Sequence, residues 1–232
     1  RLILVNSPHN PTGTVFTREE LEAIAAVCLE HDLIAITDEV YEHLTFDGVP
    51  HIPLATLPGM RERTVMISSA GKTFSVTGWK TGWVCAPAPL VTAVQTVKQF
   101  LTFTANGPWQ AAVAYALRNE LDWVANLRDE LQAKRDRLVA GLTAAGFTAL
   151  RPSGTYFVQA DIRPLGFSDG VDLCRRLPEL AGVVAIPTQV FYDDAAAGRH
   201  FVRFAFCKRD EVIDEAVRRL ARLGGAGHAG AS

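Results

Sequence analysis

A lysine at the end of an apolar run is the residue of this sequence with the clearest chemical potential. Lys72 follows the apolar run of residues 64–67 and lies in the segment S-S-A-G-K-T of residues 68–73. An amine placed among small hydroxyl and glycine residues, where a buried strand ends, can lose its proton and attack a carbonyl. The pattern is therefore compatible with a Schiff-base lysine, although many lysines beside serines are solvated surface groups.

Two further polar clusters follow apolar runs earlier in the chain. Asn10 lies in the cluster after residues 2–5, and Asp38 and Tyr41 lie in the cluster after residues 33–37. In open α/β sheets, ligands bind outside the carboxyl ends of the strands, where helix amino-termini also point. If the three strands are parallel, Asn10, Asp38 and Lys72 converge on one edge of the sheet.

Two charged residues in apolar surroundings need partners. Asp38 directly follows a buried run, so its carboxylate requires a cation or a donor to stay ionised, and a protonated ring nitrogen is suitable. Tyr41 would share a face with Asp38 if the chain turns helical there. The alternative is that Asp38 caps a helix and Tyr41 serves packing. Arg203 lies in the apolar run 201–206 and should meet a carboxylate, either of a ligand or of an internal acid.

These residues must be positioned by two kinds of element. Apolar runs alternating with helical patterns predict an α/β first part with a mostly parallel sheet, followed by a smaller α+β part. Thr17 and Glu20 form a capping box that opens the first helix. We expect a large-domain portion at 1–122, a small C-terminal domain at 123–223 and a disordered tail at 224–232. The expected strands are 2–5, 33–37, 64–68, 83–86 (antiparallel or elsewhere in the strand order), 156–161, 183–186 and 201–206; the expected later helices are 90–101, 108–145 with a break near Asn119 or Asp122, 171–177 and 210–223.

Composition excludes several classes of protein. The chain has 232 residues, 48% of them apolar and 21% charged, with a formal net charge of −2. These values are typical of a globular protein, and the mixed charges give no nucleic-acid or membrane-binding face. The six histidines and four cysteines lack metal-ligand spacing, so we expect no metal, and the cysteines are expected to be reduced and mostly buried. No run is long enough to span a bilayer, and we expect a cytoplasmic protein.

The three clusters and the arginine run resemble the signature of class I/II aminotransferases, which are pyridoxal-phosphate enzymes of fold type I. The motifs are N-P-T-G from residue 10, D-E-V-Y from residue 38, S-A-G-K from residue 69 and G-W-K from residue 78. The sequence is most similar to the kynurenine, glutamine and methionine aminotransferase branch, and nearest to actinobacterial N-succinyldiaminopimelate aminotransferases. Over residues 2–223 the resemblance implies the C-terminal portion of the fold, with an incomplete sheet of the large domain.

The resemblance implies a role for each matching residue. Lys72 would bind pyridoxal 5′-phosphate covalently and move protons to and from the substrate. Asp38 would keep the ring nitrogen protonated, and Asn10 and Tyr41 would hydrogen-bond the ring oxygen. The other implied sites are the phosphate, bound by Ser69 and Lys80, and the substrate carboxylate, bound by Arg203 and Asn10. Many relatives carry arginine where Lys80 stands, but lysine occurs in the kynurenine branch.

The implied activity is transfer of an amino group between an amino acid and a 2-oxo acid. The substrates expected from the resemblance are N-succinyl-diaminopimelate and 2-oxoglutarate, and the expected assembly is a homodimer without nucleic-acid or membrane partners. Alternatives are a kynurenine, glutamine or methionine aminotransferase, a cysteine-conjugate β-lyase, and the aminotransferase-like sensing domain of a transcription regulator. Relatives draw their phosphate loop, a ring-stacking aromatic residue and a cross-subunit residue from an earlier segment, so this chain alone is expected to be inactive.

Overall fold

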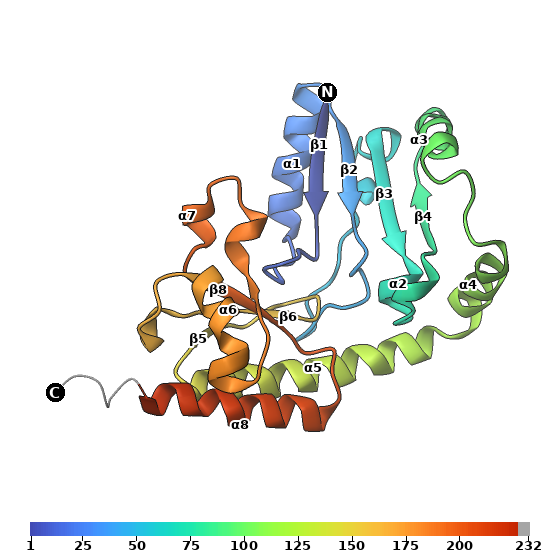
Figure 1. Cartoon of the computed structure of the whole chain (residues 1–232). Coiled ribbons are helices and arrows are strands. Elements are labelled where there is room, and N and C mark those ends of the chain that lie inside the picture. Colours follow the sequence, from blue (N-terminus) through green and yellow to red (C-terminus); the bar gives the residue numbers. More distant parts are fainter. Residues whose placement is uncertain (227–232) are drawn as a thin grey trace. The chain divides into compact units, whose positions relative to one another are not determined.

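The computed structural model describes residues 1–226, which form two compact units (Figure 1). The first unit contains residues 1–9 and 14–128, and the second contains residues 10–13 and those from Asp129 onward. The division between the units falls inside the helix α5, Leu121–Ala144. The short segment Asn10–Gly13 therefore belongs to a different unit from the residues on either side of it.

A four-stranded sheet with the order β1-β2-β3-β4 forms the centre of the first unit. The first three strands are parallel, and β4 runs antiparallel to β3. This arrangement confirms the expected mostly parallel sheet. It also selects the antiparallel direction, which was one of the two alternatives for the strand at 83–86. The strands are β1 Leu2–Asn6, β2 Ile34–Asp38, β3 Thr64–Ser69 and β4 Gly82–Cys85.

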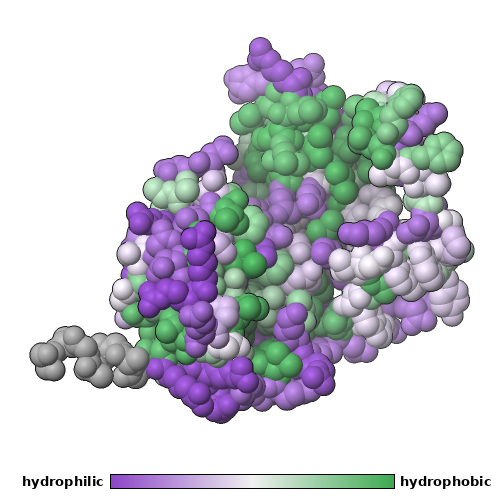
Figure 2. Space-filling view, in the orientation of Figure 1, coloured by the Kyte–Doolittle hydropathy of each residue, from purple (hydrophilic) through white to green (hydrophobic). Residues whose placement is uncertain are grey.

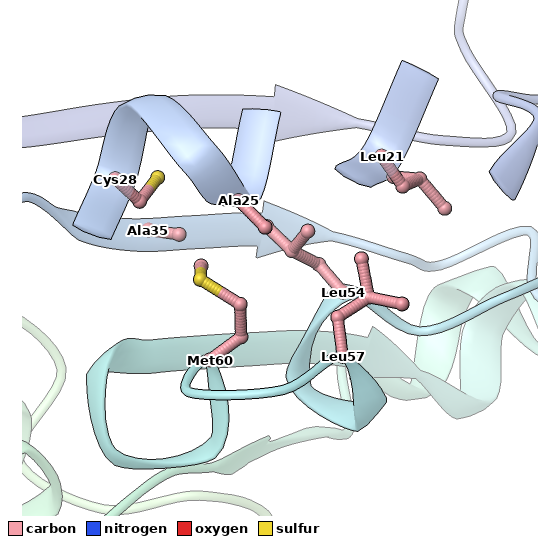
Figure 3. Packing of buried hydrophobic residues seen from close by; sticks show 7 residues of the cluster. All are labelled: Leu21, Ala25, Cys28, Ala35, Leu54, Leu57 and Met60. Carbon is pink, nitrogen blue, oxygen red and sulfur yellow. The ribbon is translucent and has the colours of Figure 1, made fainter. Parts of the chain in front are cut away.

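The helix α1, Arg18–Glu30, packs on β2 and contributes to a hydrophobic core cluster of the first unit. It begins with the predicted capping box, because Thr17 Oγ1 accepts from the Glu20 amide while Glu20 Oε2 accepts from the Thr17 amide. Figure 3 shows the buried side chains of the helix meeting β2 and the segment that leads to β3. The cluster consists of Leu21, Ala25, Cys28, Ala35, Leu54, Leu57 and Met60.

Part of the first unit leaves apolar side chains in contact with solvent. Strands that are apolar throughout, such as β1, are typical of a sheet covered on both faces, but Leu2 and Leu4 of β1 are 64% and 74% exposed in this chain. Helix α3, Ala88–Leu101, likewise exposes Val97 and Phe100. Figure 2 shows hydrophobic residues gathered over β1 and α3.

The predicted long helical stretch is two helices. They are α4, Gly107–Asn119, and α5, and the break at Glu120 confirms the predicted interruption. The first unit also contains the short helix α2, Ala70–Thr73, and the 3-10 turn η3, Thr77–Trp79, which lie between β3 and β4 and carry the S-A-G-K and G-W-K motifs.

The second unit contains an antiparallel sheet with the order β5-β6-β8-β7. Strand β5 was not predicted, and only Ile186–Pro187 pairs where a strand at 183–186 was expected. The last helix extends past Leu223 to Ala226, into the segment expected to be a tail; residues 227–232 lie outside the described residues. The elements are β5 Thr148–Leu150, β6 Phe157–Asp161, α6 Gly170–Ala181, β7 Ile186–Pro187, η5 Thr188–Phe191, α7 Ala195–Gly198, β8 Phe201–Ala205 and α8 Asp210–Ala226.

All four cysteines are free, but the expectation that most are buried is wrong. Cys28 is buried, Cys174 is half-buried, and Cys85 and Cys207 are exposed. Burial raises the pKa of the Cys174 thiol to about 11, so it is protonated at neutral pH.

Across the described part of the chain, none of the helices combines the length and the apolar character that a membrane crossing requires.

Candidate active site

The carboxyl ends of the three parallel strands are held together by hydrogen bonds to backbone carbonyls. Asn6 lies opposite Asp38 in the register, and its side-chain amide donates to the Asp38 carbonyl at 2.8 Å. On the other side, the Glu39 amide donates to the Ile67 carbonyl at 2.9 Å. The backbone around Asp38 is therefore fixed from both neighbouring strands, which positions the residues that follow β2 and β3.

Lys72 lies on α2, a helix of only four residues that depends on its surroundings. Ser69 Oγ accepts from the Gly71 amide at 3.2 Å, and Thr77 Oγ1 donates to the Gly71 carbonyl at 3.1 Å. A Cβ atom at Gly71 would lie 3.0 Å from Thr77 Cα, so this turn is closely packed. These contacts hold Lys72 in place because so short a helix has little stability of its own.

The structure brings Lys72 and Tyr41 together. Lys72 is half-buried, and its Nζ lies 5.9 Å from the centre of the Tyr41 ring, which is 3% exposed. A cation over the face of an aromatic ring is stabilised at such a distance. Two residues from the ends of different strands thus meet at the predicted edge of the sheet.

Asp38 is half-buried and ends β2. The chain does not continue as a helix, since residues 40–43 form a turn in which the Glu42 amide donates to the Glu39 carbonyl. The alternative that Asp38 caps a helix is therefore wrong, although Asp38 Oδ1 does accept from the Val40 amide at 3.3 Å, as aspartates commonly do in turns.

Lys80 and Ser69 lie at the two ends of the segment that contains Lys72. Lys80 is exposed and has a left-handed backbone, with φ 53° and ψ 40°, directly after η3. The preceding residue is anchored, because the Trp79 carbonyl accepts from Asn106 Nδ2 at 2.8 Å and the Trp79 ring stacks on Trp109 at 4.5 Å. This anchoring was not predicted, since nothing in the sequence relates residue 79 to residues 106 and 109.

A buried polar network next to Asp38 in the chain was also missed. Glu39 has a side chain that is 3% exposed, accepts from Thr37 Oγ1 at 2.8 Å and lies 2.7 Å from His51 Nε2. The sequence did contain one signal for this network. Side chains alternate between the two faces of a strand, so Thr37 and Glu39, on either side of Asp38, would share a face. Among the described residues, Glu39, Glu42 and His51 could offer ligand atoms within 4.8 Å of one another to a metal ion. The absence of a metal stays a prediction.

In the second unit, Arg203 meets Asn10. Arg203 Nη1 donates to Asn10 Oδ1 at 2.7 Å, although 193 residues separate them in the chain. The expected carboxylate-binding pair is thus close together. A cavity of about 570 Å³ in the same unit is lined by Arg203, Phe157 and Ile186 among others. His9 precedes Asn10 in the chain, and burial lowers the pKa of its imidazole.

The loop that carries Asn10 is attached to the second unit through Gly13. The amides of Ser153 and Gly154 both donate to the Gly13 carbonyl, at 3.0 and 2.8 Å. Pro152, which precedes Ser153 in the chain, accepts at its carbonyl from Nη1 of the fully buried Arg135 at 3.0 Å. The position of Asn10 beside Arg203 therefore rests on close backbone packing.

This packing predicts an unusually large cost for Gly13→Ala. A Cβ at Gly13 would lie 2.3 Å from Pro152 Cβ, and the residue has a left-handed φ of 71°. We expect a loss of about 2–4 kcal/mol, the sum of backbone strain and overpacking. The matched control is Gly48→Ala, because Gly48 has φ 73° but no heavy atom within 4 Å and should lose only about 1 kcal/mol. Thermal unfolding of the complete protein measures both, and equal losses would contradict the packing argument.

Comparison with known proteins agrees with these motifs. Residues 1–220 match the family model described as aminotransferase class I and II. The chain belongs to this family. It is 52% identical over 231 residues to the probable N-succinyldiaminopimelate aminotransferase DapC of Mycobacterium tuberculosis, a match that covers 96% of this chain and 58% of the relative. It is also 42% identical over 236 residues to kynurenine–oxoglutarate transaminase 3 of Mus musculus, covering 93% of this chain and 51% of the relative.

Solved structures of the family share the fold. The structure of N-succinyldiaminopimelate aminotransferase from Mycobacterium tuberculosis matches with a TM-score of 0.94 and 54% identity, over 96% of this chain and 58% of that one. YbdL from Escherichia coli, described with a methionine aminotransferase function, matches with a TM-score of 0.90 and 38% identity, over 96% and 58% of the two chains. The chain thus spans little more than half the length of these relatives.

Proposed function

We propose that the complete protein is a pyridoxal 5′-phosphate-dependent aminotransferase that moves an amino group between an amino acid and a 2-oxo acid. The observation that carries the proposal is the approach of Lys72 Nζ to the buried Tyr41 ring at the carboxyl edge of three parallel strands, where Asp38 ends the middle strand. Membership of the aminotransferase class I and II family supports the same activity.

The groups of the first unit fit this cofactor chemically. Lys72 offers an amine for covalent attachment, Asp38 a carboxylate for a protonated ring nitrogen, and Tyr41 a hydroxyl for the ring oxygen. Ser69 and Lys80 offer a hydroxyl and an ammonium group for the phosphate. When bound, the cofactor supplies an electron sink that stabilises negative charge at the substrate α-carbon.

The residues of this chain then divide the remaining work. The Nζ amine of Lys72 takes a proton from the substrate α-carbon and later returns one, as a general base and acid. Tyr41 contributes a buried ring beside this amine. Arg203, oriented by Asn10, binds the substrate carboxylate through a planar fork of donors. Asn10 also serves the ring oxygen of the cofactor in this proposal.

N-succinyl-diaminopimelate and 2-oxoglutarate are the substrates that we propose first. The support is the 52% identity to the probable DapC of Mycobacterium tuberculosis, compared with 42% for a kynurenine transaminase and 38% for the methionine aminotransferase of Escherichia coli. A homodimeric, cytoplasmic enzyme remains the expectation from the sequence. The carboxylate site alone does not select among these substrates, because every amino acid carries the carboxylate that Arg203 would bind.

The test is a half-reaction with the complete protein. Purified holoenzyme is mixed with a panel containing N-succinyl-diaminopimelate, kynurenine, glutamine, methionine and a cysteine conjugate, and the cofactor absorbance is followed as each amino acid is consumed. The proposal predicts rapid loss of the initial absorbance band with at least one of them and its recovery on addition of 2-oxoglutarate. The 232-residue chain alone serves as a control and should show neither change.

The outcomes separate the activity from the substrate. Absence of a spectral change with any amino acid would reject the aminotransferase proposal. A response to kynurenine or methionine but none to the succinylated substrate would keep the activity and change the substrate. Release of pyruvate and ammonia from a cysteine conjugate, without transamination, would favour a β-lyase.

A further inference from the structure

The guanidinium of Arg203 is surrounded by more than its hydrogen-bond partner. Arg203 is the middle residue of β8, opposite Gln159 of β6 and Ile186 of β7. Its Nη1 donates to Asn10 Oδ1 at 2.7 Å. This contact holds one end of the planar group, and ordering an arginine side chain by restricting rotation about its bonds has an entropic cost.

Two aromatic rings restrict that rotation. The guanidinium carbon lies 4.0 Å from the centre of the Phe157 ring and 5.0 Å from the centre of the Phe191 ring. The rings come from different elements, since Phe157 begins β6 and Phe191 ends η5. A guanidinium is weakly hydrated and favours aromatic faces, so the two rings hold the charge near the sheet without neutralising it.

The two rings differ in what else they do. Phe157 is buried and also belongs to the core of the second unit. Phe191 is 45% exposed, between Val190 and Tyr192, which are 61% and 39% exposed. Little of the Phe191 ring is therefore used for core packing, and its contact with Arg203 is the feature that distinguishes it from its neighbours.

We propose that Phe191 is a positioning residue for the carboxylate-binding site, holding Arg203 in the orientation that receives the substrate carboxylate. The inference rests on the proposed aminotransferase function. The alternative is that Phe191 lines a pocket for the substrate side chain. A ring that acts through Arg203 affects all substrates equally, because all carry the same carboxylate. A ring that contacts the side chain affects substrates according to that side chain.

Replacement of Phe191 by leucine in the complete holoenzyme separates these roles. Loss of the ring should raise KM for the amino acid and for the 2-oxo acid by similar factors of about 3- to 10-fold, with kcat nearly unchanged, as expected for a single cation–π contact. Phe191→Tyr, which keeps the ring, should restore the wild-type values. The dissociation constant of glutarate, which has carboxylates but no amine or keto group, should rise by the same factor in calorimetry.

Val190→Ala is the matched control, since Val190 lies on the same turn, is exposed and is not one of the residues proposed for the site. It should leave KM and glutarate binding unchanged. An unchanged KM and glutarate affinity in Phe191→Leu would overturn the inference, and so would a KM change that depends on the substrate side chain. Failure of the wild-type holoenzyme to transaminate any amino acid would instead reject the proposed function on which the inference rests.

Discussion

Replacement of Lys72 by alanine in the complete protein is expected to abolish transamination and the covalent attachment of the cofactor. Lys72 lies on the short helix after β3, half-buried, with its amine 5.9 Å from the centre of the Tyr41 ring. Removing the amine removes both the nucleophile and the proton carrier, so the rate should fall by about a thousandfold or more. Borohydride treatment followed by mass spectrometry should detect the cofactor on the wild-type protein and not on the variant.

Two other lysines provide controls for this result. Lys98→Ala changes a residue on α3 whose amine donates to Thr102 Oγ1, and it should keep both activity and the covalent adduct. Lys80→Ala should keep the covalent adduct but bind the cofactor more weakly, because it removes a charge proposed to meet the phosphate. A borohydride-stable adduct that persists in Lys72→Ala would show that another lysine is the attachment site.

Replacement of Arg203 by methionine is expected to give the second-largest loss. The variant keeps much of the volume of the side chain but removes the charged fork that Asn10 orients. Hydrogen bonds to charged groups each contribute about 1.5–3 kcal/mol, so kcat/KM should fall by about a hundredfold or more. Arg203→Lys keeps the charge but not the fork, and it should recover only part of that loss.

Steady-state kinetics with both substrates measures this effect. Arg199→Met is the control, since Arg199 belongs to the same unit but pairs with Asp169 at 3.1 Å and is mainly exposed. It should leave kcat/KM close to the wild-type value. If Arg203→Met were as active as Arg199→Met, the substrate carboxylate would have to bind elsewhere.

Features that depend on neighbouring residues could be predicted from the sequence. The capping box of Thr17 and Glu20 is a local exchange of hydrogen bonds, and the structure confirms it. The parallel strands could be inferred because apolar runs alternate with a helix, and a break near Glu120 because the helical stretch is long enough to contain one. The two-residue strand at Ile186 was harder to predict, because so short a strand forms only through its pairing with β8.

Contacts between distant residues could not be predicted from spacing. The resemblance to aminotransferases supplied the roles of Asn10 and Arg203. The contact between Arg203 and the Phe191 ring could not be predicted, because it depends on how η5 packs against β8. The pairing of Glu39 with His51 depends on the path of the loop between them. Such contacts depend on tertiary packing, which a single sequence does not report.

The cap on the helix of Lys72 has a thermodynamic consequence. Ser69 Oγ accepts from the Gly71 amide, and a hydroxyl that accepts in this way still has its own proton to donate. If that proton goes to a phosphate oxygen, one atom joins the ligand to the backbone of the turn. Binding of the phosphate and ordering of the turn are then thermodynamically linked. A higher concentration of free cofactor would therefore increase the fraction of the protein in which the turn that carries Lys72 is ordered.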